Sequence, residues 1–597
     1  MIAYCKVMID SPLPQLGREF DYKIPSGETL VVGQPATVPF GRQSKPKNAV
    51  VTELLEQSDY ATAEIKELLG PPVLSGTFLQ YIKSLAKRQA ISPGELLRLS
   101  LTSKPKRRND FLDEIDDVPE WVLETLGGRI ELDGHLSEMV SAKQAMLSGV
   151  LHPHWALTAL RSALSAEGSV ILNTPDHRYQ LRLKRLLDEL KISQSFYWAD
   201  EYKTPARRYW LQQRLLKQGG ILIGSRSVMM MDIKDLDRIV LINDLDPSHE
   251  SEASPYLATR ELAFIRSEAQ GGMVHVIAHT PSAELLRLAE LGYIKTKSNT
   301  DVPRISFGSE TQISTSKLIA EAIKTGPVLI LTSFSGDSAA ISCKRCRSSG
   351  ACQKCGGAIY MPGVETYRCR TCANMEKPIC VSCGSNEFNK GGKGATRRAA
   401  DFGKIIPGAR VIESSQSKQV DSVSSKAVVV ATPGAIPIAP DGYRLVVIDQ
   451  PQSFLSRESL RALEHSLRIW TDAASHLSPD GQLHFANYEG DVVKKLSIGQ
   501  FADLIRKETM QRKELGLSPW RRLGIVEGDG SRLNEIADSI QAVDVISSNP
   551  RLVFTYQYKD GPKVAEQLLR EQLATPPLEG ERRKRGLRVI MDGQGLI

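Results

Sequence analysis

Residues 343–383 read CKRCRSSGACQKCGGAIYMPGVETYRCRTCANMEKPICVSC, and this stretch decides how the middle of the chain folds. It holds eight of the nine cysteines in a chain of 597 residues, arranged as four C-x-x-C pairs. The pairs are Cys343 with Cys346, Cys352 with Cys355, Cys369 with Cys372, and Cys380 with Cys383. Two thiolates spaced in this way can reach one tetrahedral ion from a single tight turn. The pattern therefore predicts two zinc ions, each held by two pairs.

Other uses of paired cysteines fit this stretch less well. Redox-active pairs occur singly beside a thioredoxin-like pattern, and iron–sulfur clusters more often use irregular spacings. Four thiolates leave no position open for water, so each zinc site would be structural. Gly356 and Gly384 each follow a pair, where the backbone has to turn sharply. The spacing leaves open whether the pairs combine in sequential or in nested order. The ninth cysteine, Cys5, has apolar neighbours and is predicted to be a buried core thiol.

Short apolar runs alternate with longer helical patterns on both sides of the cysteines. The runs lie at residues 169–172, 220–224, 238–243, 273–278 and 327–331, and then at 410–412, 427–431 and 444–449. Runs of this kind are typical of parallel strands that helices cover on both faces. The alternation predicts two doubly wound α/β lobes, with the cysteine module inserted into the second.

The two ends of the chain have different patterns. Strand-like runs at residues 7–9, 20–24, 35–40 and 49–55 are separated by Gly and Pro, which predicts a β-rich domain. A helical pattern follows over residues 75–98, and the polar stretch 103–120 is typical of a linker. Near the C-terminus, a helix over 501–515 and strands at 523–527, 552–558 and 587–592 predict an α+β domain.

The composition is that of a globular protein, with 41% hydrophobic and 24% charged residues. A net charge of +7 favours polyanionic partners but does not identify nucleic acid. No run of 18 apolar residues is present, and residues 1–10 lack the features of a signal peptide. Because clustered cysteines in a long chain also suit a reducing compartment, we expect a cytoplasmic protein that does not contact membranes.

Several motifs, in order along the chain, point to one family. They are FDY at residues 20–22, VPFG at 38–41, GSRS at 224–227, the cysteine array, IPGARVI at 406–412 and SPWRRL at 518–523. Together these motifs resemble the PriA family of primosomal replication-restart proteins, and the resemblance spans nearly the whole chain. It implies two RecA-like helicase lobes for the two α/β lobes.

The resemblance also implies a domain order. A 3′-DNA-end-binding domain would occupy residues 1–102, and a linker or reduced winged helix would occupy residues 103–140. The first helicase lobe would occupy residues 141–310 and the second residues 311–342 and 384–490, with the zinc module inserted at residues 343–383. A C-terminal domain would occupy residues 491–597.

Site residues follow from the same resemblance. One zinc ion would be held by Cys343, Cys346, Cys380 and Cys383, and the other by Cys352, Cys355, Cys369 and Cys372. The pocket for a 3′-terminal nucleotide would be lined by Phe20, Asp21, Tyr22, Gly41 and Lys66. Asp21 can accept a hydrogen bond from a 3′-hydroxyl, and its charge would repel an additional phosphate. Lys66 can neutralise a backbone phosphate, and Phe20 or Tyr22 can stack on a base.

The chain departs from the family where an ATPase needs its phosphate-binding loop. No G-x-x-x-x-G-K-[ST] motif occurs in the 597 residues. Residues 149–156 read GVLHPHWA at the place where the family has this loop, so Trp155 replaces the lysine and Ala156 the hydroxyl residue. Pro153 also removes an amide that could bind phosphate.

Two further ATPase motifs are altered. Residues 243–246 read NDLD where the family has D-E-E-H, although Asp244 and Asp246 could still bind a cation. Residues 472–477 read DAASHL where the family has an arginine-containing motif, and losing such an arginine costs about three to five orders of magnitude in hydrolysis. The sequence therefore predicts an inactive helicase homologue that is not an enzyme and does not bind ATP.

The predicted function is replication restart without helicase activity. The protein would recognise forked or branched DNA with an exposed 3′ end and help to reload the replicative helicase. Its partners would be forked or single-stranded DNA, primosome and helicase-loading proteins, and the single-stranded-DNA-binding protein. Two alternatives stay open: an ATP-dependent 3′–5′ helicase with an unusual ATP site, and a zinc-bearing assembly factor unrelated to DNA.

Overall fold

The computed structural model describes residues 2–102, 145–149 and 155–592, apart from short gaps. The gaps lie at residues 12, 14–15, 42–44, 191–195, 252, 299–302, 310–311, 334–338, 347–349, 354–358, 362–366, 370–374, 376, 382, 391–394, 407, 424–425, 456–458, 549–550 and 576–585. The predicted linker or winged helix over 103–140 lies outside the described residues. Among those that are described, no helix is both long and apolar enough to cross a membrane.

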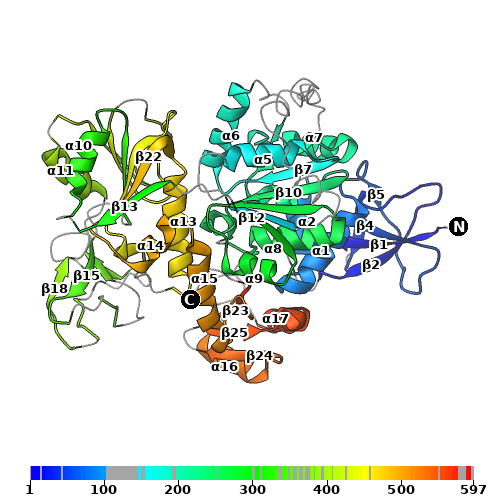
Figure 1. The fold of residues 1–597 in the computed structure, drawn as a ribbon. Helices are drawn as coiled ribbons and strands as arrows, with labels where there is room; N and C mark the ends of the chain where they lie inside the picture. The colour runs from blue at the N-terminus through cyan, green and yellow to red at the C-terminus, as the bar shows by residue number, and fades with distance from the viewer. Residues whose placement is uncertain are drawn as a thin grey trace. The chain divides into compact units, whose positions relative to one another are not determined.

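The chain divides into two compact units (Figure 1). The first unit includes the described parts of Met1–Gly149, His154–Ser298 and Arg506–Leu596, and the second those of Asn299–Ile505. The finer domain boundaries stay predictions.

The first unit begins with a five-stranded antiparallel sheet in the order β2-β1-β4-β3-β5. Its strands are β1 (Tyr4–Ile9), β2 (Glu19–Lys23), β3 (Pro35–Phe40), β4 (Lys45–Leu55) and β5 (Glu67–Leu68). The segment 63–66 closes the gap between β2 and β3. The Lys23 amide donates to the Ala63 carbonyl, the Ile65 amide donates to the Lys23 carbonyl, and the Lys66 amide donates to the Thr37 carbonyl. The β-rich domain is therefore a small closed barrel.

The helical pattern after this barrel forms two helices, α1 (Gly76–Gln89) and α2 (Pro93–Ser100). Ala90 has φ of 51° and ends α1 in the left-handed conformation. The Ser92 side chain then accepts the amide of Glu95 and begins α2, with Pro93 in the first turn. The helical pattern predicted over 75–98 is therefore confirmed, and a cap and a proline in its middle divide it into two helices.

A seven-stranded sheet follows in the order β12-β6-β11-β10-β7-β9-β8, and all of its recorded pairings are parallel. Its strands are β6 (Ala145–Gly149), β7 (Ser169–Asn173), β8 (Tyr197–Trp198), β9 (Ile221–Gly224), β10 (Leu236–Ile242), β11 (Met273–Ala278) and β12 (Ile294–Ser298). Its helices are α5 (Trp155–Leu164), α6 (His177–Glu189), α7 (Pro205–Gln218), α8 (Thr259–Gln270) and α9 (Ala283–Glu290). Figure 1 shows α5 and α6 on one side of the sheet and α8 on the other. The four predicted strands are confirmed as β7, β9, β10 and β11.

The C-terminal part of this unit is an antiparallel sheet in the order β24-β25-β23-β26. Its elements are β23 (Arg522–Glu527), α16 (Gly530–Ser539), β24 (Val543–Ser547), β25 (Leu552–Tyr556), α17 (Gly561–Ala574) and β26 (Arg588–Met591), and α15 (Phe501–Glu514) precedes them. The predicted helix and three strands are confirmed, whereas β24 was not predicted. Most residues of β24 are exposed, so it lacks the apolar run that identified the others.

The second unit contains a six-stranded sheet in the order β13-β22-β21-β14-β20-β19. Its strands are β13 (Arg304–Gly308), β14 (Val328–Leu331), β19 (Val411–Ser414), β20 (Val428–Ala431), β21 (Tyr443–Ile448) and β22 (Leu477–Ala486). Its helices are α10 (Thr315–Ala322), α11 (Ala395–Ile405), α12 (Gln452–Leu455), α13 (Ala462–Ala474) and α14 (Asp491–Ser497).

A small antiparallel sheet with the order β17-β16-β15-β18 is inserted between β14 and α11. Its strands are β15 (Ala339–Cys343), β16 (Ile359–Met361), β17 (Arg368–Cys369) and β18 (Phe388–Lys390). Cys343 and Cys369 end two of these strands, and the other described cysteines of the array lie in the segments that connect them. The prediction of two α/β parts with a cysteine module in the second is confirmed at this level.

Candidate metal centre and DNA-end site

Strand pairing brings the first and last cysteine pairs of the array together. Cys343 is the final residue of β15 and pairs with Phe388 of β18. Because these strands run antiparallel, the turn before β18 comes back to the end of β15, and that turn includes Cys380 and Cys383. Gly384 has φ of 71°, the left-handed conformation that a turn at this point requires and that glycine adopts without strain.

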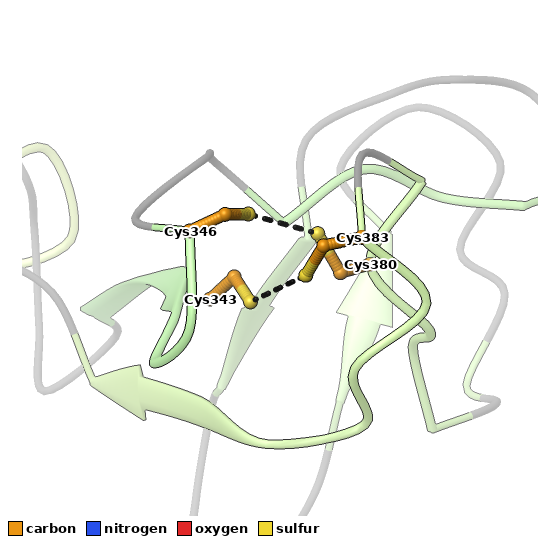
Figure 2. Close-up of side chains that lie close together, drawn as sticks. All are labelled: Cys343, Cys346, Cys380 and Cys383. Carbon is orange, nitrogen blue, oxygen red and sulfur yellow. Dashed lines mark hydrogen bonds between the residues drawn. The ribbon is translucent and has the colours of Figure 1, made fainter.

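The four sulfur atoms of Cys343, Cys346, Cys380 and Cys383 all lie within 4.8 Å of one another. Figure 2 shows them facing one another, with 3.5 Å between the Sγ atoms of Cys343 and Cys383 and 3.5 Å between those of Cys346 and Cys380. A tetrahedral zinc ion with bonds of about 2.3 Å separates its sulfur ligands by roughly 3.8 Å. The cluster could therefore hold one metal ion, and all four donors would come from the protein.

The four thiols also affect one another's pKa values. The amide of Cys346 and the burial of the sulfur act in opposite directions on Cys343, and the net effect is a lowered pKa. For Cys383, the amide of Ser385 lowers the pKa, but burial and the neighbouring thiols raise it to about 12. Four thiolates so close together repel one another, and a divalent cation would offset that repulsion.

Of each inner cysteine pair, the structure describes one member, Cys352 or Cys369. Cys352 and Cys369 are buried in a small core with Ile341, Ile359 and Met361. Cys369 pairs with Ile359 through the register of β17 and β16. Cys355, Cys372 and Gly356 lie outside the described residues, so the second zinc site stays a prediction.

The predicted DNA-end residues lie around the seam where segment 63–66 closes the barrel. Phe20 is half-buried in β2, and its ring meets the ring of Phe40 edge-on at 5.1 Å. Tyr22 is only 5% exposed, and its hydroxyl donates to the Pro39 carbonyl at 2.8 Å. Stacking of Tyr22 on a base was therefore wrong, because its ring is part of the barrel core.

Asp21, Gly41 and Lys66 occupy more open positions around this seam. Asp21 is half-buried, and its Oδ2 accepts a hydrogen bond from Ser58 Oγ at 2.5 Å. Gly41 and Lys66 are exposed, at the end of β3 and in segment 63–66. Sequence reasoning did not identify Ser58, because no local pattern links it to a strand 37 residues earlier.

In the parallel sheet, an aromatic stack occupies the start of α5. Trp155 is the first residue of this helix and is 1% exposed. Its ring centre lies 5.1 Å from that of Tyr179 and 5.1 Å from the guanidinium carbon of Arg182. Asn243 Nδ2 donates to the Tyr179 hydroxyl at 2.9 Å. Residues 150–154 lie outside the described residues, and Ala156 is buried beside Trp155.

The carboxylates after β10 take part in structural contacts. Asp244 is fully buried, and burial raises the pKa of its carboxyl group despite the nearby Arg260 guanidinium. Arg260 Nη1 lies 3.2 Å from Asp244 Oδ2 and 3.3 Å from Glu284 Oε2. Asp246 accepts the amide of Ser248 and begins a short 3-10 helix. These contacts use both groups that the sequence had suggested as cation ligands.

Residues 472–477 end α13 and begin β22, at the place of the missing arginine motif. Ser475 is buried, and its hydroxyl donates to the Asp472 carbonyl at 2.7 Å. This segment is therefore a helix end packed into the second unit.

A cavity of about 520 Å³ lies beside the GSRS motif in the first unit. Its lining includes Asp176, Ser225, Ser227 and Ser254. Arg226, also in the lining, donates to the Ser248 carbonyl at 3.3 Å. The walls combine these hydroxyl groups and carboxylates with apolar side chains such as Leu99, Met230 and Leu257.

Comparison with known proteins gives one consistent relationship. Residues 6–102 match a family model described as the PriA 3′DNA-binding domain (3′BD). The probable replication restart protein PriA of Mycobacterium tuberculosis is 25% identical, over 89% of this chain and 88% of the relative. The replication restart protein PriA of Rickettsia conorii is 21% identical, over 61% and 59% of the two chains.

A solved structure of RecG bound to a three-way DNA junction was also found, with a TM-score of 0.39 and 10% identity. It covers 74% of this chain and 55% of that chain. The family relationship rests on the sequence relatives and on the matched N-terminal domain.

Proposed function

We propose that this chain is a PriA-type replication-restart protein that binds forked or branched DNA at an exposed 3′ end and does not hydrolyse ATP. The observation that carries the proposal is the N-terminal match at residues 6–102, within a relationship to PriA proteins over 89% of the chain. In that role it would act in the cytoplasm and help to reload the replicative helicase, together with primosome, helicase-loading and single-stranded-DNA-binding proteins.

The 3′ end of DNA would be held at the barrel seam. Asp21 would accept the 3′-hydroxyl, and its negative charge would exclude a 3′-phosphate. Lys66 is exposed in the closing segment, where its ammonium group can approach the backbone phosphate.

The proposed absence of ATPase activity is supported by the residues at the carboxyl ends of the parallel strands. We call this the nucleotide edge of the sheet, because a nucleotide would bind there. Ligands of open α/β sheets bind at the carboxyl ends of the strands, with phosphate at a helix N-terminus. At this edge, α5 begins with the buried Trp155, which is packed against Tyr179. Asn243 and Asp244 after β10 are engaged with Tyr179 and Arg260. An indole in place of the lysine supplies no charge for phosphate, and it fills space in which phosphate would have to lie.

The cysteine module would hold two zinc ions in nested order. The described cluster accounts for the outer site, with Cys343, Cys346, Cys380 and Cys383 as its ligands. The inner site would use Cys352, Cys355, Cys369 and Cys372. When bound, the ions would supply cross-links that hold this small module together, since its described core is slight.

The test is equilibrium binding to a fork with a 3′-hydroxyl on its leading strand, compared with the same fork carrying a 3′-phosphate. ATP hydrolysis is read in the same samples. We expect about tenfold tighter binding to the 3′-hydroxyl fork, because the phosphate removes a charge-assisted hydrogen bond and faces a carboxylate. Asp21→Ala should abolish this preference. Glu53→Ala, which removes a carboxylate elsewhere in the barrel, should keep it.

Each remaining outcome favours another function. Equal weak binding to both forks would overturn the DNA-end assignment and favour a zinc-bearing assembly factor unrelated to DNA. DNA-stimulated hydrolysis would show an active 3′–5′ helicase with an unusual ATP site.

A further inference from the structure

We propose that the loop formed by residues 58–61 belongs to the DNA-end site, with Ser58 as the residue that positions Asp21 and Tyr60 as the residue that stacks on the terminal nucleobase. This inference rests on the proposed function and extends it to residues that no sequence motif identifies. Three structural features support it. A hydrogen bond links the loop to β2, Tyr60 is exposed to solvent, and the other aromatic rings of the predicted pocket already pack against protein groups.

The link is a single hydroxyl group. Ser58 Oγ donates to Asp21 Oδ2 at 2.5 Å and accepts the amides of Tyr60 and Ala61, each at 3.2 Å. The loop and the carboxylate are therefore held by the same atom. With Oδ2 engaged by Ser58, the proposal assigns the 3′-hydroxyl to Asp21 Oδ1.

The position of this loop follows from the closure of the barrel. Lys23 of β2 forms a parallel bridge with Glu64, which places the chain just before Glu64 alongside the middle of β2. Asp21 lies in that middle part. The loop therefore lies beside the strand from which the carboxylate projects, and it continues directly into the segment that contains Lys66.

Tyr60 is the ring that this region presents to solvent, with 82% of its surface exposed. A single exposed tyrosine is ordinary on a protein surface. Tyr60 differs because its own amide is bound to the hydroxyl that holds Asp21. Because the backbone of Tyr60 is held next to a 3′-hydroxyl acceptor, its exposed ring can reach the base of the same nucleotide and stack on it, a contact that tolerates any base.

The other aromatic residues of the predicted pocket are already engaged. Tyr22 is in the barrel core. Phe20 contacts Phe40 edge-on, and the guanidinium carbon of Arg18 lies 5.0 Å from the centre of its ring. Stacking by Phe20 would require Arg18 to move, whereas Tyr60 requires no rearrangement.

The experiment uses the full chain and a fork whose leading strand ends in 2-aminopurine with a 3′-hydroxyl. Quenching of 2-aminopurine reports stacking at that base, and titration reports affinity. We expect Tyr60→Ala to weaken binding about tenfold and to remove most of the quenching. Tyr60→Phe should keep both, because the ring is retained. Tyr293→Ala serves as the matched control, since Tyr293 is 72% exposed elsewhere in the same unit.

The role of Ser58 is tested by measuring how strongly each variant prefers the 3′-hydroxyl fork over the 3′-phosphate fork. A merely structural role of Ser58 would not change this preference selectively. We expect Ser58→Ala to reduce the preference for 3′-hydroxyl over 3′-phosphate several-fold, by about the effect of one charge-assisted hydrogen bond. Ser58→Thr keeps the hydroxyl and should restore the preference. Unchanged thermal unfolding of each variant checks that the barrel is intact.

The proposed function and the proposed role of residues 58–61 would be overturned by different results. Wild-type protein that binds both forks equally would overturn the proposed function, and this inference with it. A wild-type preference that stays intact, with unchanged quenching in Tyr60→Ala and unchanged discrimination in Ser58→Ala, would overturn this inference alone.

Discussion

A buried core thiol and a thiol that could bind a metal ion differ in what surrounds the sulfur, and this chain contains both kinds. Cys5 lies in the barrel core, where burial, together with the charge of Asp21, raises the pKa of its thiol to about 12. It therefore stays protonated and takes no part in metal binding. In the outer cysteine cluster, the four sulfurs approach one another closely enough to share an ion.

Replacing one of these four cysteines should remove one metal site. We expect Cys380→Ser to lower the zinc content by about one ion per chain, because a hydroxyl group is a poor substitute for a thiolate. Inductively coupled plasma mass spectrometry of the purified proteins measures this directly. Cys5→Ala is the matched control and should leave the zinc content unchanged. A Cys380→Ser protein with undiminished zinc would show that the cluster is not a metal site.

At the scale of elements, a buried charge network joins α8 to the C-terminal sheet. Arg522 Nη1 in β23 lies 2.7 Å from Glu261 Oε1 in α8 and 3.7 Å from Asp592 Oδ1. Burial raises the pKa of Glu261, but Arg522 and Arg260 outweigh burial and hold it below its usual range. Burial raises the pKa of the Asp592 carboxyl group, which lies farther from Arg522 than Glu261 does. Because the folded pKa of Glu261 is depressed, its contribution to stability is present at neutral pH and is lost in acid.

Breaking this network should be costly. We expect Arg522→Met to lower the free energy of unfolding by about 3–5 kcal/mol, because the buried Glu261 loses its 2.7 Å contact with Arg522 and keeps the longer 3.6 Å contact with Arg260 Nε. Arg570→Met is the control: it removes an exposed pair with Glu566 on α17, a contact worth about 0.3–0.5 kcal/mol. Urea unfolding followed by circular dichroism compares the two. Equal small losses would mean that the network contributes no more than a surface pair.

At the scale of the whole molecule, the two units should differ in their response to metal removal. The metal cluster lies in the second unit, whereas the nucleotide edge with Trp155 lies in the first. We expect a strong zinc chelator to lower the unfolding temperature of the second unit and to leave the first unit unchanged. Differential scanning calorimetry, combined with proteolysis to identify the fragment that unfolds, measures both responses.

Magnesium and ATP should have no effect on either transition. A ligand present at a hundred times its dissociation constant stabilises a protein by about 2.7 kcal/mol, which calorimetry detects readily. A rise in the unfolding temperature with ATP would contradict the view that Trp155 and its neighbours exclude nucleotide.

Several properties of this protein can be derived from its sequence because the signals are local. The C-x-x-C pairs predict zinc from the spacing within each pair, and the apolar runs of β7, β10 and β20 identify strands that are buried on both faces. The missing lysine at Trp155 is likewise visible without a structure. β24 was missed because an exposed strand has no such run, and the cap at Ser92 that divides the helical stretch 75–98 into two helices was not recognised.

The tertiary structure decided what depends on residues far apart in the chain. Pairing of β15 with β18 brings Cys343 close to Cys383, so the first and last cysteine pairs lie together. The spacing alone left open which pairs combine. Closure of the barrel buries Tyr22, joins Ser58 to Asp21 and leaves Tyr60 exposed. Each of these contacts links residues between 17 and 40 positions apart. Their formation depends on strand pairing and on which face of a sheet is covered, so no local pattern in the sequence encodes them.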